Sequence, residues 1–132
     1  RYGTVTGVQT CALPIWAAIE STLRTIAGFA PRGSELVFDY LITPDQLTAK
    51  EREGVQLVHR LASRRGEPLI SEFDPDDMAA KMAGMGYDLV EHLNPAQLNQ
   101  RYFNDRSDGL VTTPNSWFVR AVVRYQMTTP TQ

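Results

Sequence analysis

Pro31-Arg-Gly-Ser-Glu-Leu-Val-Phe-Asp-Tyr-Leu-Ile42 is the stretch of the chain that decides its fold. Pro31 and Gly33 mark its start, and a nearly continuous run of apolar side chains follows, interrupted only by Asp39. A strand that is apolar on both faces is typical of a sheet covered by helices on both sides, so we expect a buried strand over Ser34–Ile42. Because a buried carboxylate is costly without a partner, Asp39 should either face a cleft near the carboxyl end of this strand or be paired.

A helix is predicted immediately before this strand. Within Ala17–Ala30, the apolar residues Ile19, Leu23 and Ile26 recur at the spacing of one helical face. Pro31 ends the helix, because a residue that precedes proline disfavours the helical conformation. A helix joined to a strand by a short link indicates an alternating α/β domain.

The alternation continues after the strand. A second helix is expected to begin at Thr43 or, through an alternative capping box, at Thr48–Glu51, and to end near Arg65. Glu67–Phe73 is expected to be a loop or a short extended segment. One face of the second helix is apolar, made by Val55, Val58, Leu61 and Ala62.

Two more helices are predicted to begin at Asp74 and Asn94, where a capping side chain is followed by proline. Strands are predicted over Tyr87–Leu93 and Trp117–Tyr125. Three methionines share one face of the helix after Asp74 and are expected to fill the core: Met78, Met82 and Met85.

Composition excludes several classes of protein. The 132 residues suffice for one domain, 42% of them are hydrophobic, and the net charge of -2 brings no basic stripe for nucleic acid. No apolar run approaches the length of a membrane span, and no signal peptide is recognisable. The single cysteine, Cys11, cannot form an internal disulfide, so we expect a reducing, cytoplasmic location. From the net charge and the lack of a long apolar run, we expect no nucleic-acid or membrane partner.

The N-terminal segment reads differently from the rest of the chain. Val5-Thr-Gly-Val-Gln-Thr-Cys-Ala-Leu-Pro-Ile15 resembles the translation of a common sequencing adapter. We therefore expect residues 1–15 to be non-native and poorly packed, and the authentic domain to occupy residues 16–132. The alternative is a native strand over Thr4–Cys11.

Candidate functional residues are concentrated in Arg101–Leu110, which combines arginines, aromatic residues and aspartates in a predicted loop. The alternative is a loop held by its own salt bridges. His59 and His92 lack partners at metal-ligand spacing, and no nucleophile–base arrangement is visible.

Several local sequences stand out in a fixed order along the chain: Leu23–Tyr40, Gly66-Glu-Pro68, Phe73-Asp-Pro75, Gly86-Tyr-Asp-Leu-Val90, Leu98-Asn-Gln-Arg-Tyr-Phe103 and Arg106-Ser-Asp-Gly-Leu110. Together with the order of elements, they resemble the leucine carboxyl methyltransferase family, in particular its bacterial branch of S-adenosylmethionine-dependent enzymes. The resemblance covers nearly all of the chain from Ala17 to Val123.

This resemblance implies the C-terminal half of a Rossmann-like class I methyltransferase fold. It also implies a mixed sheet in which the strand over Trp117–Tyr125 runs antiparallel between those over Ser34–Ile42 and Tyr87–Leu93. The cofactor would be S-adenosyl-L-methionine, and the reaction would be methyl transfer to a carboxylate or hydroxyl oxygen. The family's cofactor-binding segments lie upstream of this region, so no cofactor residue is assigned and the chain alone is expected to be inactive.

The acceptor, a small molecule or a carboxylate, would be oriented by Arg101, Tyr102 and Arg106. Arginine can orient a carboxylate through paired hydrogen bonds, and an ionised carboxylate needs no general base. The alternatives are a non-catalytic α/β binding or interaction module and another small α/β enzyme such as a hydrolase.

Overall fold

The computed structural model describes residues 16–66 and 71–124. The expected adapter-derived segment, residues 1–15, and its expected poor packing lie outside the described residues, as does the end of the predicted last strand. In chain order the elements are α1 (Trp16–Phe29), β1 (Glu35–Ile42), the 3-10 turn η1 (Pro44–Gln46), α2 (Ala49–Arg64), β2 (Glu72–Phe73), α3 (Pro75–Gly84), β3 (Tyr87–Leu93), α4 (Pro95–Leu98), the π-helical turn η2 (Asn99–Phe103) and β4 (Ser116–Val123).

The strands form a mixed four-stranded sheet in the order β2-β1-β4-β3. The last long strand, β4, is antiparallel to both of its neighbours, β1 and β3. This arrangement confirms the predicted order and the predicted antiparallel last strand. The segment expected to be a loop or short extended stretch supplies β2, which pairs in parallel with β1 only at Leu41 and Ile42.

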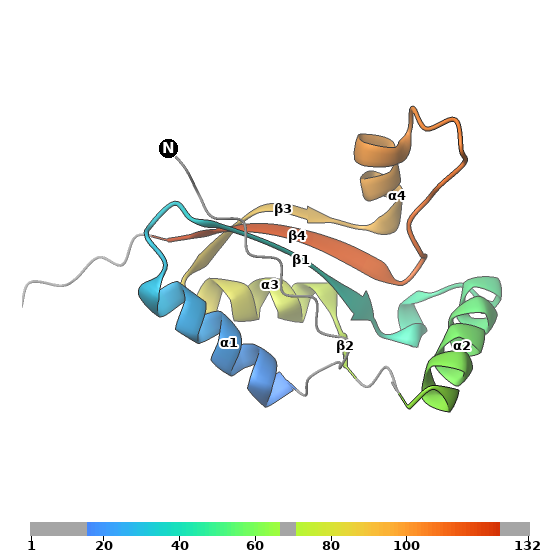
Figure 1. Ribbon diagram of the computed structural model, residues 1–132, viewed down its shortest axis with the longest axis horizontal. Coiled ribbons are helices and arrows are strands. Elements are labelled where there is room, and N and C mark those ends of the chain that lie inside the picture. The colour runs from blue at the N-terminus through green and yellow to red at the C-terminus, as the bar shows by residue number, and fades with distance from the viewer. Residues whose placement is uncertain (1–15, 67–70, 125–132) are drawn as a thin grey trace, which may run out of the picture.

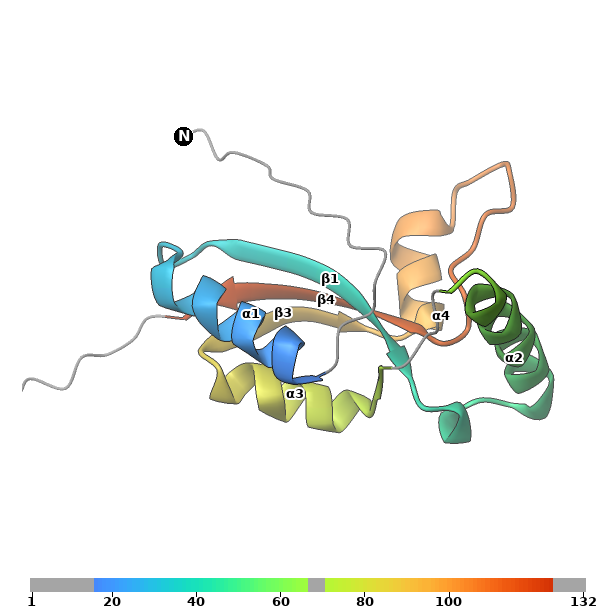
Figure 2. The ribbon, with the colours of Figure 1, turned by 60° about the horizontal axis from the view of Figure 1, so that its bottom comes forward.

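Helices α1 and α3 lie on the same side of the sheet (Figures 1 and 2). Their buried side chains meet the inward residues of the strands, and Met82, Tyr87 and Val119 are completely buried there. The Tyr87 hydroxyl donates a 2.6 Å hydrogen bond to the carbonyl of Leu23 and so ties β3 to α1. The predicted role of the methionines as core residues is confirmed, since Met78, Met82 and Met85 are all buried.

The expectation that helices cover both faces of β1 is wrong. Exposure alternates along the strand, so that Glu35, Val37 and Asp39 are exposed while Tyr40 is buried. Val37 is 55% exposed on the face opposite α1 and α3. Asp39 is paired as expected, because the Ser116 hydroxyl on β4 donates a 3.1 Å hydrogen bond to it.

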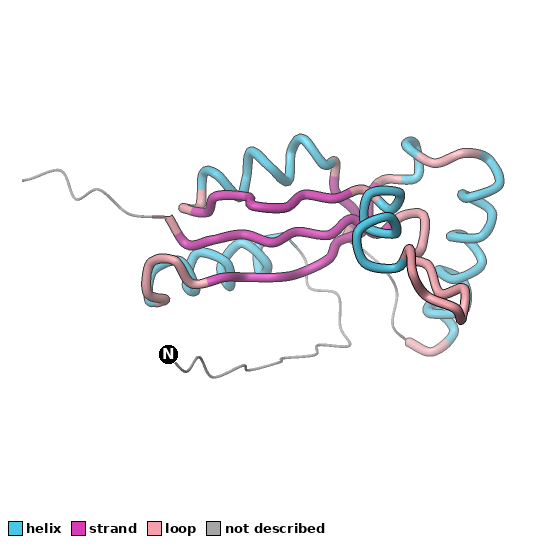
Figure 3. Tube along the Cα trace, turned by 90° about the horizontal axis from the view of Figure 1, so that it is seen from above, coloured by secondary structure: helices cyan, strands magenta, loops and turns pink. Residues whose placement is uncertain are grey.

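Helix α2 lies beyond the ends of the long strands (Figure 3). It begins at the second of the two predicted caps: Thr48 and Glu51 form a capping box, whereas Thr43 makes no side-chain cap. The predicted apolar face of α2 is only partly buried. Val55 on this face is buried, whereas Val58 and Leu61 are each about half exposed. With only one buried residue, α2 gains little tertiary stabilisation.

No helix in the described part of the chain is long and apolar enough to cross a membrane.

Candidate functional site

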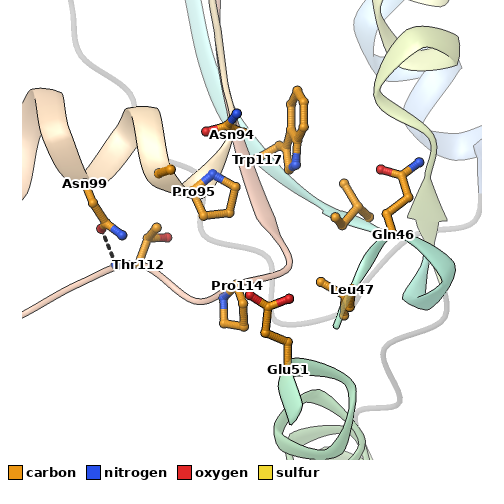
Figure 4. Close-up of a pocket in the computed structure, with 11 residues that line it drawn as sticks. Gln46, Leu47, Glu51, Asn94, Pro95, Asn99, Thr112, Pro114 and Trp117 are labelled. Carbon is orange, nitrogen blue, oxygen red and sulfur yellow. Dashed lines mark hydrogen bonds between the residues drawn. The ribbon is translucent and has the colours of Figure 1, made fainter. Parts of the chain in front are cut away.

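A pocket of about 460 Å³ opens where the carboxyl ends of β1 and β3 meet the amino end of β4. Open α/β sheets commonly bind ligands beyond the carboxyl ends of their strands. Figure 4 shows the lining side chains arranged around this space. They are Ile42, Gln46, Leu47, Glu51, Asn94, Pro95, Ala96, Asn99, Thr112, Pro114 and Trp117.

The wall formed by α4 is positioned by a capping box. The Asn94 side chain accepts a 2.8 Å hydrogen bond from the Gln97 N–H, and the Gln97 side chain accepts one from the Asn94 N–H. One turn later, Asn99 Oδ1 accepts a 2.8 Å bond from the Thr112 N–H, which holds the loop before β4 against the helix (Figure 4). The sequence Asn94-Pro95, recognised above as a helix start, thus sets one side of the pocket.

Opposite this wall, the start of α2 contributes a carboxylate. Glu51 Oε2 accepts a 2.9 Å hydrogen bond from the Thr48 N–H. The Glu51 side chain also lines the pocket. The capping box that begins α2 therefore holds a negative charge at the edge of the pocket.

Behind the pocket lies a cluster of three aromatic side chains. Tyr40 and His92 share a 2.6 Å hydrogen bond between the phenol oxygen and Nε2, and the His92 ring meets the Trp117 ring edge-on at 5.1 Å. Burial raises the pKa of Tyr40, with a smaller contribution from the carboxylates of Asp74 and Asp76. Burial also lowers the pKa of His92, partly opposed by Asp76. Both shifts favour the neutral forms.

Arg101 and Tyr102, two of the predicted site residues, converge on Glu91 of β3. Arg101 forms an ion pair with Glu91, and the Tyr102 hydroxyl lies 3.0 Å from both carboxylate oxygens. On the neighbouring strand, Arg120 Nε donates a 2.8 Å bond to the same carboxylate and Nη1 donates a 2.9 Å bond to Glu35. Hydrogen bonds from Arg120 and Arg101 lower the pKa of Glu91 to about 2, so it is ionised at neutral pH.

Arg106, the third predicted site residue, lies apart from this group and binds Asp108 at 2.9 Å. None of the three predicted residues lines the pocket at the carboxyl ends of the strands. Arg101 borders a separate hollow of about 400 Å³ with Leu93, Gln97 and Gln100. The predicted loop over Arg101–Leu110 also needs correction, because its first residues continue α4 as the π-helical turn η2.

Several residues of the pocket escaped the sequence analysis. Glu51 and Asn94 were recognised only as caps, and Trp117 only as the start of a strand. The signal that could have singled them out is position, since each lies at an end of a strand or helix that the topology brings to one edge of the sheet. No cluster of three or more histidine, cysteine or acidic residues suited to a metal occurs among the described residues.

The chain is similar to a protein of Bacillus subtilis (strain 168) named "Putative S-adenosyl-L-methionine-dependent methyltransferase YktD", with 29% identity over 103 residues. The match covers 77% of this chain and 34% of that protein, so the chain spans about a third of the relative's length. No family model matches the chain, and no solved structure matches it. The similarity supports the expected likeness to S-adenosylmethionine-dependent methyltransferases, while the leucine carboxyl methyltransferase branch stays a prediction.

Proposed function

We propose that this chain is part of an S-adenosyl-L-methionine-dependent methyltransferase that acts on an oxygen acceptor, and that it corresponds to the C-terminal half of a Rossmann-like fold of the leucine carboxyl methyltransferase kind. The similarity over 103 residues to the Bacillus subtilis protein carries the proposal. The mixed sheet, with β4 antiparallel between β1 and β3, is compatible with it.

No site for the whole cofactor is assigned to the described residues, because the resembled family holds it with segments that lie upstream of this region. No lysine or arginine that could pair with the carboxylate of S-adenosyl-L-methionine is among the described side chains that line the pocket at the strand ends. We therefore assign no cofactor-binding residue to this region and derive no step through the cofactor. The part that this region plays in the proposed enzyme is to receive and orient the acceptor.

Two groups of residues are candidates for that part. The first is the pocket beside Glu51 and Trp117, which has the volume of a small-molecule site. The second is Arg101 with Tyr102, because the Arg101 side chain remains 53% exposed despite its ion pair with Glu91. Arg106 stays a candidate through its position in the same segment, although Asp108 occupies its guanidinium.

The test begins with intact genomic DNA that encodes residues 16–132. We expect the uninterrupted reading frame to carry, upstream of Trp16, a glycine-rich strand–turn–helix followed by an acidic residue. The protein expressed from that frame should bind S-adenosyl-L-methionine in calorimetric titration and transfer a labelled methyl group. A frame without such a segment, or a protein that binds no cofactor, would contradict the proposal.

The matched control is the 132-residue chain itself. It should show no saturable binding of S-adenosyl-L-methionine and no methyl transfer, because the resembled family holds the cofactor with segments upstream of the region that this chain matches. Saturable micromolar binding by this chain would show that the cofactor site lies within it and would overturn the assignment of the cofactor to upstream residues.

Arg101→Ala in the longer protein then separates the two acceptor candidates. If Arg101 orients the acceptor, the variant should lose methyl transfer far more than it loses thermal stability. If Arg101 serves only to hold Glu91, activity and stability should fall together, and the acceptor site should be sought beside Glu51.

A further inference from the structure

We infer that the pocket at the strand ends takes a small, partly apolar ligand whose polar group is an uncharged hydroxyl or an ammonium, and that it discriminates against carboxylates. The identification of this ligand as the methyl acceptor rests on the proposed function. If the ligand is the acceptor, the inference narrows the expected acceptor group from a carboxylate or a hydroxyl to a hydroxyl. The acceptor molecule as a whole would then be neutral or positively charged. The preference for charge is a property of the pocket and stands on the contacts that follow.

The charge that the lining residues present is negative. Among the described side chains that line the pocket, Glu51 is the charged one. Beside the lining, the Gln46 amide donates a 2.7 Å hydrogen bond to Asp74, a second carboxylate, which also caps α3. An anionic ligand would have to approach Glu51 with no cation among the described side chains that line the pocket, and like charges placed together oppose binding.

The groups near the pocket that could attract an anion are directed to other partners. Arg52 is not among the described side chains that line the pocket, and its guanidinium, which keeps its charge, donates at 3.2 Å to the carbonyl oxygens of Pro44 and Leu47. At the start of α4, the N–H groups of Asn94 and Gln97 are bound by each other's side chains. Two of the backbone donors that could bind an anion at this helix start are therefore used by side chains.

The remaining lining suits a neutral or cationic partner. Trp117, Ile42 and Leu47 give apolar walls, and an indole ring attracts an ammonium through its electron-rich face. Asn94 and Asn99 use their side-chain oxygens in the hydrogen bonds described above, which leaves each amide NH₂ to donate to a ligand oxygen without adding positive charge.

The test uses three probes of similar shape and different charge: benzylamine, benzyl alcohol and benzoate. The chain has two tryptophans, so Trp16→Phe leaves Trp117 as the single indole reporter in the otherwise complete 132-residue chain. Quenching of its fluorescence is titrated with each probe at neutral pH and low salt. We expect benzylamine to bind at least about fivefold more tightly than benzoate, which corresponds to one modestly screened charge contact, with benzyl alcohol between them.

Glu51→Gln tests the origin of the preference. Glutamine at this position can still complete the capping box with Thr48, so the start of α2 should be retained. In this variant benzylamine should lose its advantage over benzyl alcohol, while the affinity of benzyl alcohol stays unchanged. Glu53→Gln, an exposed charge two residues along α2 and outside the lining, is the matched control and should leave the order of the probes as it was.

Three results would overturn the inference: tighter binding of benzoate, an unchanged benzylamine preference in Glu51→Gln, or no saturable quenching by any probe. None of these measurements involves methyl transfer. A failure of the probe titration therefore leaves the proposed methyltransferase activity standing, and a longer protein that binds no cofactor leaves the charge preference standing.

Discussion

Glu91 shows how a single buried carboxylate can join a helix to a sheet. Its side chain is 6% exposed and accepts hydrogen bonds from Arg120 of β4 and from Arg101 and Tyr102 of η2. A shift in the register between Leu89 and Glu91 places Glu91 opposite Arg120. The helical turn that carries Arg101 and Tyr102 is thus linked to the sheet through this ionised side chain, and the Tyr102 ring also packs against the Phe118 ring of β4 at 5.9 Å.

This arrangement predicts an acid-dependent loss of stability. The pKa of Glu91 is about 2 in the folded chain and ordinarily 4.5, so its stabilising contribution is complete above pH 4.5 and is lost as the pH falls toward 2. Glu91→Gln should lower the free energy of unfolding at neutral pH, and the difference from the parent chain should shrink below pH 4.5. Urea unfolding at a series of pH values measures both effects.

Asp108→Asn is the control for Glu91. Arg106 lowers the pKa of Asp108 as well, but both side chains are exposed and solvent screens the pair. The control variant should therefore change stability much less at neutral pH. A stability difference between Glu91→Gln and the parent chain that stays constant from pH 7 to pH 2 would contradict the assigned role of the carboxylate.

Replacing each of the two histidines by leucine should have opposite effects on the free energy of unfolding. Within the described parts of the chain, His59 Nε2 is buried without a hydrogen-bond partner, and a carboxylate oxygen of Glu72 lies 3.7 Å from it. His59→Leu should therefore raise the free energy of unfolding by about 1 kcal/mol, because an unsatisfied polar atom is removed. His92→Leu should lower it by about 1–3 kcal/mol, because the Tyr40 hydroxyl loses its partner. Equal losses in both variants would show that His59 contributes packing that outweighs its missing hydrogen bond.

At the scale of elements, α2 depends on its cap more than on its packing. Only Val55 of this helix is buried, and helices with few tertiary contacts are marginal in water. Thr48→Ala should therefore destabilise α2 by about 1 kcal/mol and speed amide exchange there about fivefold, without changing exchange in α3. Hydrogen exchange resolved by residue measures this, and Thr43→Ala, which removes a threonine that makes no cap, should leave exchange in both helices unchanged.

The same elements show what can be predicted from sequence. Helix starts at Thr48, Asp74 and Asn94 were recognisable, because a cap acts within a few residues and leaves a local signature. Two starts were possible near the second helix, and geometry selected Thr48 over Thr43. The order of the strands followed from the resemblance to a known fold and not from local pattern.

The prediction failed where the answer depended on contacts between distant parts of the chain. An apolar run over β1 did not reveal that one of its faces is open, because hydrophobicity reports a tendency to be buried and not the presence of a covering element. The apolar stripe of α2 shows the same limit, because Val58 and Leu61 on that stripe are each about half exposed. Arg101 and Tyr102 were found as unusual residues, but their joint partner Glu91 lies on another element and carried no local signal.

At the scale of the whole molecule, the unpaired backbone edge of β1 should control the association of one chain with another. Among the described residues, β1 pairs on its outer edge with β2 only at Leu41 and Ile42, so the edge from Glu35 to Tyr40 carries no strand. An unpaired edge offers its N–H and C=O groups to another chain. We therefore expect the purified 132-residue chain to self-associate at micromolar to millimolar concentrations.

Two lysine substitutions separate the surfaces that could drive this association. Val37→Lys places a charge in the middle of the open edge strand, where Val37 is 55% exposed, and Leu61→Lys places one on the apolar face of α2, where Leu61 is 50% exposed. Because a charge in an edge strand opposes pairing with a second strand, Val37→Lys should shift the sedimentation profile toward the monomer, whereas Leu61→Lys should leave it unchanged. A monomeric parent chain would contradict the open-edge argument, and an effect confined to Leu61→Lys would assign the association to α2.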